Sequence, residues 1–122
     1  MAYLREEKEN LEVSYPIKIL WDKIPKALEK LKWTTEEKEE AKFHLTVKTK
    51  GAFLSYSSTM MIDLIVVDKN TTKMSIAAET PVTTITSIAD YGRTRERIDM
   101  FVTTLAKLME TPKKNASQNQ ST

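Results

Sequence analysis

The chain of 122 residues contains no cysteine. It therefore has no disulfide, no thiolate ligand for a metal and no thiol nucleophile, and its composition fits a reducing compartment. No apolar run is long enough to span a bilayer, and the first residues, MAYLREEKEN, lack a signal-peptide pattern. We therefore expect a cytoplasmic protein with no membrane partner.

Glycine and histidine are also scarce, with two glycines and one histidine in the chain. The phosphate-binding patterns GxGxxG and GxxxxGK are absent, which argues against the nucleotide chemistry that depends on them. His44 has no HxH or HxxxH partner and lies on the polar side of an alternating segment, so we interpret it as an exposed strand residue. We expect no metal, no cofactor and no catalytic residue, and therefore a chain that is not an enzyme.

No charge of one sign dominates, because 19 basic residues stand against 17 acidic ones. Lys113 and Lys114 lie near the polar end of the chain, and the body without them is formally neutral. Proteins that bind nucleic acids usually carry a concentrated basic excess. The charge distribution therefore argues against a nucleic-acid partner.

Hydrophobic periodicity predicts the first half of the fold. Alternation in LEVSY predicts a short strand over residues 11–15, and we expect residues 1–10 to be a flexible N-terminus. Apolar residues spaced three and four apart predict a helix from Ile17, which Pro25 should kink or divide into two. The charged run TTEEKEE, residues 34–40, is interpreted as a connection.

Alternation predicts several more strands in the middle of the chain. The pattern is clearest in AKFHLTVKT, and further strands are predicted in AFLSYSS, TMMIDLIVVD, KMSIAAE and VTTITSIA. We expect a turn near Asn70, and we expect Pro81 to break the strand that precedes it. Asp63 is an isolated acid in an apolar strand, and we favour an edge position or an ion pair over an acid/base role.

A stripe of apolar residues at helical spacing predicts a final helix that begins near Gly92 and ends at Pro112. The polar residues 111–122 should form a disordered tail. Short turns make neighbouring strands antiparallel, and two amphipathic helices can cover one face of their sheet. The sequence thus predicts a single α+β domain over residues 11–110, with the order β-α-β-β-β-β-α.

This order resembles the half-repeat of TATA-binding protein, and it is similar to the larger helix-grip fold. The segments VSYPIKILWDKI and RIDMFVTTLAKLM resemble the first and last elements of helix-grip chains. The segment TTITSIADYGRTRERIDMFVTTL also resembles the ending of small uncharacterised prokaryotic domains of this shape. The resemblance concerns topology and pattern over residues 11–110, so it assigns no functional residue.

One predicted strand, residues 60–67, is apolar on both faces. A sheet covered by helices on one side should be polar on the other, so Met61, Ile65 and Val67 need a cover. We expect a homo-oligomer that associates through this face and acts as a small non-enzymatic binding domain. In the alternative, these residues and Trp33 line a helix-grip cavity for a small apolar ligand.

The segment DYGRTRERIDMF places arginines at a helix start, where the helix dipole disfavours cations. Gly92, Arg93 and Arg97 are a candidate anion-binding site, because backbone N–H groups and guanidinium groups could converge there. Local neutralisation is the favoured alternative, with Arg95 paired to Asp99 four residues later. The sequence pattern assigns no such acidic partner to Arg97, so its surroundings in the structure decide between the two interpretations.

Overall fold

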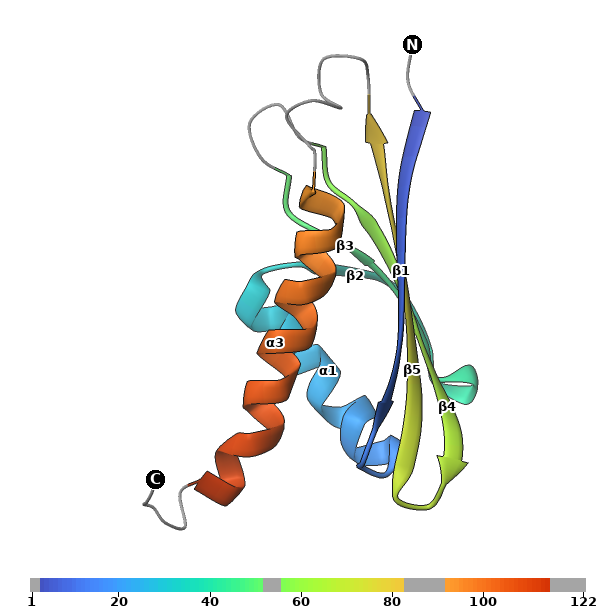
Figure 1. Cartoon of the computed structure of the whole chain (residues 1–122), viewed down its shortest axis with the longest axis vertical. Coiled ribbons are helices and arrows are strands. Elements are labelled where there is room, and N and C mark those ends of the chain that lie inside the picture. Colours follow the sequence, from blue (N-terminus) through green and yellow to red (C-terminus); the bar gives the residue numbers. More distant parts are fainter. Residues whose placement is uncertain (1–2, 52–55, 83–91, 115–122) are drawn as a thin grey trace.

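The computed structural model describes residues 3–51, 56–82 and 92–114 of the chain. In chain order its elements are β1 (Tyr3–Val13), α1 (Ile17–Leu31), β2 (Thr34–Glu39), the short 3-10 helix η1 (Glu40–Lys42), β3 (His44–Lys48), β4 (Thr59–Asp68), β5 (Thr71–Val82) and α3 (Arg93–Lys114). The five strands form one antiparallel sheet in the order β1-β5-β4-β3-β2. Both α-helices lie on the same face of this sheet (Figure 1), which confirms the predicted two-layer α+β class and element order.

The edge strand β1 is much longer than the alternation predicts. It begins at Tyr3 and pairs with β5 along its whole length, from Tyr3 opposite Val82 to Val13 opposite Thr72. The expectation of flexibility therefore fails for residues 3–10, which lie in this strand. From Arg5 to Asn10 the side chains are polar on both faces, so backbone hydrogen bonds rather than a hydrophobic stripe hold this part of β1 in the sheet.

The opposite edge strand, β2, corrects the interpretation of residues 34–40 as a connection. Thr34–Glu39 pairs antiparallel with β3, although its side chains are almost all exposed. Charged side chains are typical of edge strands, where they discourage pairing with another chain. Because neither face of β2 is buried, its sequence lacks the alternation that identifies a half-buried strand.

Helix α1 runs without a break from Ile17 to Leu31, so Pro25 does not divide it. Pro25 lies on the exposed side of the helix, where its ring meets solvent and only one backbone donor is lost. Residues at the predicted spacing face the sheet and are buried: Leu20, Trp21, Ile24, Ala27 and Leu28.

The central strands confirm the predicted alternation. Leu45 and Val47 of β3 are buried, as are Met60, Ile62 and Leu64 of β4. The β4–β5 turn forms as predicted, with the backbone N–H of Asn70 donating to Asp68 Oδ1 at 2.9 Å. The predicted strand AFLSYSS is not formed at residues 56–58, and its residues 52–55 lie outside the described part of the chain.

Pro81 does not end β5, which continues to Val82. Strand β4 begins opposite Glu79, so at Pro81 only β1 flanks the strand and one missing N–H is tolerated. The last predicted strand, VTTITSIA, falls on residues 82–89, and beyond Val82 it lies outside the described residues.

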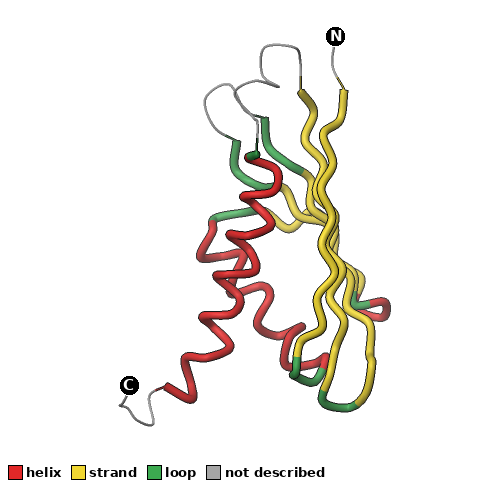
Figure 2. The backbone as a smooth tube through the Cα atoms, viewed as in Figure 1, coloured by secondary structure: helices red, strands yellow, loops and turns green. Residues whose placement is uncertain are grey.

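Helix α3 lies over the inner face of the sheet, on the same side as α1 (Figure 2). It begins after Gly92, whose positive φ of 79° favours glycine, and it passes through Pro112 to Lys114. Pro112 is thus not the end of the helix. Its predicted stripe packs on the core, with Ile98, Phe101, Leu105 and Met109 buried. No helix in the described ranges is long and apolar enough to cross a lipid bilayer.

Candidate ligand-binding cavity

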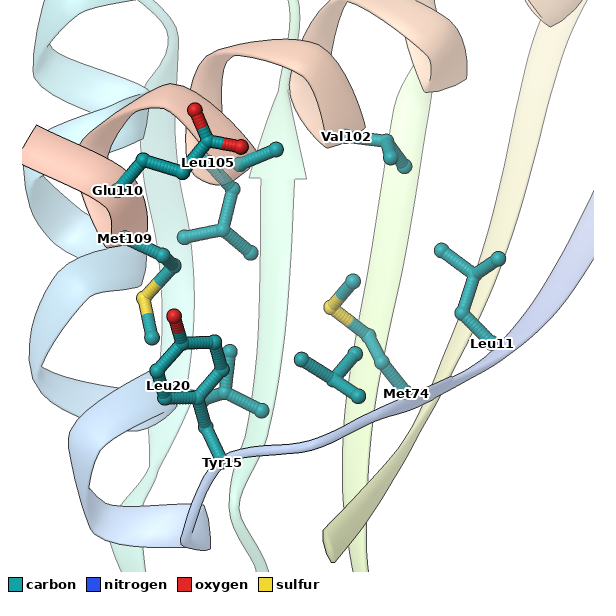
Figure 3. A pocket seen from close by; sticks show the side chains of 10 residues that line it. Leu11, Tyr15, Leu20, Met74, Val102, Leu105, Met109 and Glu110 are labelled. Carbon is teal, nitrogen blue, oxygen red and sulfur yellow. The ribbon is translucent and has the colours of Figure 1, made fainter. Parts of the chain in front are cut away.

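A cavity of about 180 Å³ lies between the C-terminal half of α3 and the sheet. Its wall is formed by β1, β5, the start of α1 and α3 (Figure 3). The lining residues are Leu11, Val13, Tyr15, Leu20, Met74, Val102, Leu105, Ala106, Met109 and Glu110. Glu110 is the only charged residue among them, so the space suits an apolar molecule.

The pairing of β1 with β5 determines which of their side chains line the cavity. Leu11 and Val13 lie two apart on β1 and share its inner face, and Leu11 is paired with Met74 of β5. The Thr72 hydroxyl donates to the Tyr15 carbonyl oxygen at 2.8 Å, which fixes the chain as it leaves β1. The hydrogen bond thereby holds the start of α1 against the sheet at one end of the cavity.

Helix α3 supplies the opposite wall through residues spaced at three and four. Val102, Leu105, Ala106 and Met109 fall on one face by this spacing, and all four line the cavity. Figure 3 shows the Met74 and Met109 side chains on facing walls, one from β5 and one from α3. Flexible thioethers of this kind adapt to apolar ligands of different shape.

The residues predicted for a pocket lie elsewhere. Met61 and Ile65 alternate with the buried residues of β4 and so belong to the outer face of the sheet, away from both helices. Val67 lies at the register shift near the end of β4 and is exposed. None of them lines the cavity between the sheet and α3. Trp33 is buried at the far end of α1 and borders a second cavity. The geometry therefore gives Met61, Ile65 and Val67 no part in this cavity, whereas Trp33 lines a different one.

The outer face of the sheet also carries the single histidine. His44 Nδ1 lies 2.6 Å from Asp63 Oδ1 on the neighbouring strand, and His44 Nε2 lies 3.1 Å from Thr46 Oγ1. Thr46 in turn donates to Glu37 Oε1 at 3.4 Å. The cross-strand pair agrees with the favoured interpretation of Asp63 as an ion-pair partner.

The arginines at the start of α3 have different surroundings. Arg95 pairs with Asp99 at 3.6 Å, as predicted, and also with Glu9 of β1. The hydrogen bond from Arg95 to the Glu9 carboxylate raises the pKa of the guanidinium above its ordinary value, although this side chain is partly exposed. Sequence reasoning missed Glu9, because the strand that carries it was expected to be flexible.

Arg97 is only 6% exposed. Its Nη1 donates to the Ser58 hydroxyl at 2.6 Å and to the Tyr56 carbonyl oxygen at 3.0 Å. The Ser58 hydroxyl also lies 2.6 Å from Thr80 Oγ1, which lies 2.8 Å from Thr94 Oγ1. A chain of buried hydroxyls thus anchors the guanidinium between β5 and α3.

No family model and no curated protein matches the sequence, whereas solved structures match its fold. Norcoclaurine synthase from Thalictrum flavum, in complex with dopamine and hydroxybenzaldehyde, is 11% identical with a TM-score of 0.69. The match covers 88% of this chain and 87% of the synthase. The Zhui aromatase/cyclase from Streptomyces sp. R1128 is 9% identical with a TM-score of 0.64, covering 98% of this chain and 100% of that one. Ara h 8.0201 is 7% identical with a TM-score of 0.66, covering 88% and 99%.

The chain has the helix-grip fold. The helix-grip part of the resemblance is therefore supported, since these matches combine high coverage with the same order of strands and helices. Identities this low show the shape alone and assign no residue.

The expectation that the chain is not an enzyme is contradicted. The similar structures include a synthase and an aromatase/cyclase, so this fold carries enzymes. The sequence argument excluded only catalysis that depends on recognisable motifs, such as phosphate loops or metal-ligand spacings. A helix-grip cavity has no such motif, because its wall residues come from separate strands and helices.

Proposed function

We propose that the protein binds a small apolar ligand in the cavity between α3 and the sheet. The observation that carries this proposal is a space of about 180 Å³ whose wall, apart from Glu110 and the Tyr15 hydroxyl, is hydrocarbon and thioether. Water in such a space has few hydrogen-bond partners, so an apolar molecule should replace it favourably.

The volume limits the size of the ligand. An engineered apolar cavity of about 150 Å³ holds benzene, whereas pockets for drug-sized molecules usually measure about 300–1,000 Å³. The space therefore suits a molecule with one aromatic ring better than a molecule with several fused rings. The norcoclaurine synthase structure is a complex with dopamine and hydroxybenzaldehyde, which supports small aromatic ligands for this fold.

Toluene provides a direct test, because two methionines report on the cavity. In a methyl NMR titration, toluene should shift the Met74 and Met109 signals, which line the cavity, and leave Met61 and Met100 unchanged. Val13→Phe should weaken toluene binding about tenfold or more, because the added ring occupies the space. The matched control is Glu12→Phe, which places the same ring on the exposed face of β1.

Equal toluene affinity in the Val13→Phe and wild-type proteins would refute the proposed site. Shifts at Met61 in place of Met74 would place the ligand on the outer face of the sheet instead.

Self-association is a second candidate function, supported by the outer face of β4. Ile65 and Val67 are 50% and 49% exposed near the end of β4, where β5 is the neighbouring strand, and a solvated sheet face is normally polar. A second copy of the chain that covers this face would remove both side chains from water.

Multi-angle light scattering after size exclusion tests this candidate. The wild-type protein should approach twice the monomer mass as its concentration rises, and the double variant Ile65→Lys, Val67→Lys should remain monomeric because the charges resist burial. Ile19→Lys is the control, since Ile19 is also exposed but lies on α1. A wild-type protein that stays monomeric throughout would exclude dimerisation through this face.

A further inference from the structure

A second cavity, of about 190 Å³, lies at the other end of α3 and is lined by three cations. Arg93 and Arg97 come from the first turns of α3, four residues apart and therefore on one side of the helix. Lys50 comes from the segment after β3, and Glu96 is the only acidic residue in the lining. The wall thus keeps a net positive charge.

Trp33 and Met100 supply apolar surface to the same cavity. Trp33 follows α1, and its backbone N–H donates to the Leu28 carbonyl oxygen at 3.0 Å, which fixes the chain around the buried ring. The cavity therefore offers an apolar side and a cationic side within a small volume. A ligand that matches both sides carries an anionic group on an apolar body.

The Arg97 guanidinium is held in place before any ligand arrives. Its bonds to Ser58 Oγ and the Tyr56 carbonyl oxygen fix one nitrogen. Ser58 is itself held, because its backbone N–H donates to Thr49 Oγ1 at 2.8 Å and its carbonyl oxygen accepts from the Thr49 N–H at 2.9 Å. A fixed cation loses little conformational entropy when an anion binds beside it.

We propose that this second cavity binds a small organic carboxylate, with Lys50 and Arg93 contacting the carboxylate beside Arg97 and with Trp33 contacting the apolar body. Guanidinium groups match the planar carboxylate, and charge-assisted hydrogen bonds are the stronger kind. The site joins Arg93 and Arg97, which the sequence pattern groups as a candidate anion-binding site, with Trp33, which the sequence assigns to a separate pocket. It is independent of the toluene-sized cavity, which shares no lining residue with it.

The probe is benzoate, compared with benzamide as a neutral molecule of the same shape. We expect benzoate to shift the Trp33 indole N–H and the Gly92 amide in an NMR titration, and benzamide to bind about tenfold more weakly because it lacks the charge. The double variant Lys50→Gln, Arg93→Gln should weaken benzoate binding by about the same factor or more. Lys18→Gln, Lys26→Gln removes the same net charge from exposed positions on α1 and should leave the affinity unchanged.

Several results would overturn this proposal. These are equal affinity for benzoate and benzamide, full affinity in the Lys50→Gln, Arg93→Gln variant, or inorganic phosphate binding as tightly as benzoate. The toluene titration separates this site from the first one, because Lys50→Gln, Arg93→Gln should bind toluene normally and Val13→Phe should bind benzoate normally.

Discussion

Replacing Phe101 with alanine should lower the free energy of unfolding by about 4 kcal/mol. Phe101 is fully buried near the middle of α3, and it is among the largest buried side chains in the described part of the chain. Its ring packs in the core that α1, α3 and the sheet share. Truncation would lose the transfer free energy of the ring and leave a void that the two-layer fold cannot fully close.

The neighbouring residue offers the control for this measurement. Met100 is 43% exposed, so Met100→Ala should change the unfolding free energy by about 1 kcal/mol or less, with similar helix propensity. Urea denaturation followed by circular dichroism measures both variants. Similar losses in the two would mean that α3 is not seated on the sheet through Phe101.

The buried Phe101 beside the exposed Met100 is part of a periodic pattern, and such patterns are the parts of the fold that can be predicted from sequence. The stripe on α3 and the alternation in β3 are periodic, and burial of one face by the second layer creates that period. The first part of β1, from Arg5 to Asn10, and the whole of β2 carry polar side chains on both faces and have no such signal. Their backbone pairing depends on a neighbour far away in sequence, as when Tyr3 meets Val82.

The candidate cavity was less predictable than the fold, for a physical reason. Leu11, Met74 and Leu105 have the same spacing as core residues, and only the distance between layers leaves a space among them. Pattern can identify the inner face of each element, but it cannot show whether facing side chains meet. The sequence pattern assigns a binding role to Ile65 and Val67 instead, because apolar residues on both faces of a strand break the expected alternation.

The arginines illustrate the same limit in the polar part of the molecule. Arg95 and Asp99 could be paired from sequence, since four residues separate them on one helix. The partners that the structure gives Arg97 lie 39 and 41 residues away, at Ser58 and Tyr56. Such contacts form only when the fold brings α3 against the segment before β4.

Arg97 should therefore be the most sensitive polar residue of α3. Arg97→Met keeps much of the side-chain volume but removes the donors to Ser58 and the Tyr56 carbonyl oxygen, leaving buried polar groups without them. We expect a loss of about 3 kcal/mol in unfolding free energy, because hydrogen bonds to charged groups contribute about 1.5–3 kcal/mol and buried groups left unpaired add to the loss. The control Arg95→Met breaks ion pairs that are partly exposed to solvent and should lose about 1 kcal/mol or less.

A double-mutant cycle can show that the effect of Arg97 passes through the hydroxyl chain. If it does, Ser58→Ala and Arg97→Met should be non-additive by about 1 kcal/mol or more, since each variant removes the same hydrogen bond. Additive losses would mean that Arg97 stabilises the fold through other contacts. Non-additive losses would show that Arg97 and Ser58 act as one unit at the end of the hydroxyl chain that continues through Thr80 to Thr94 on α3.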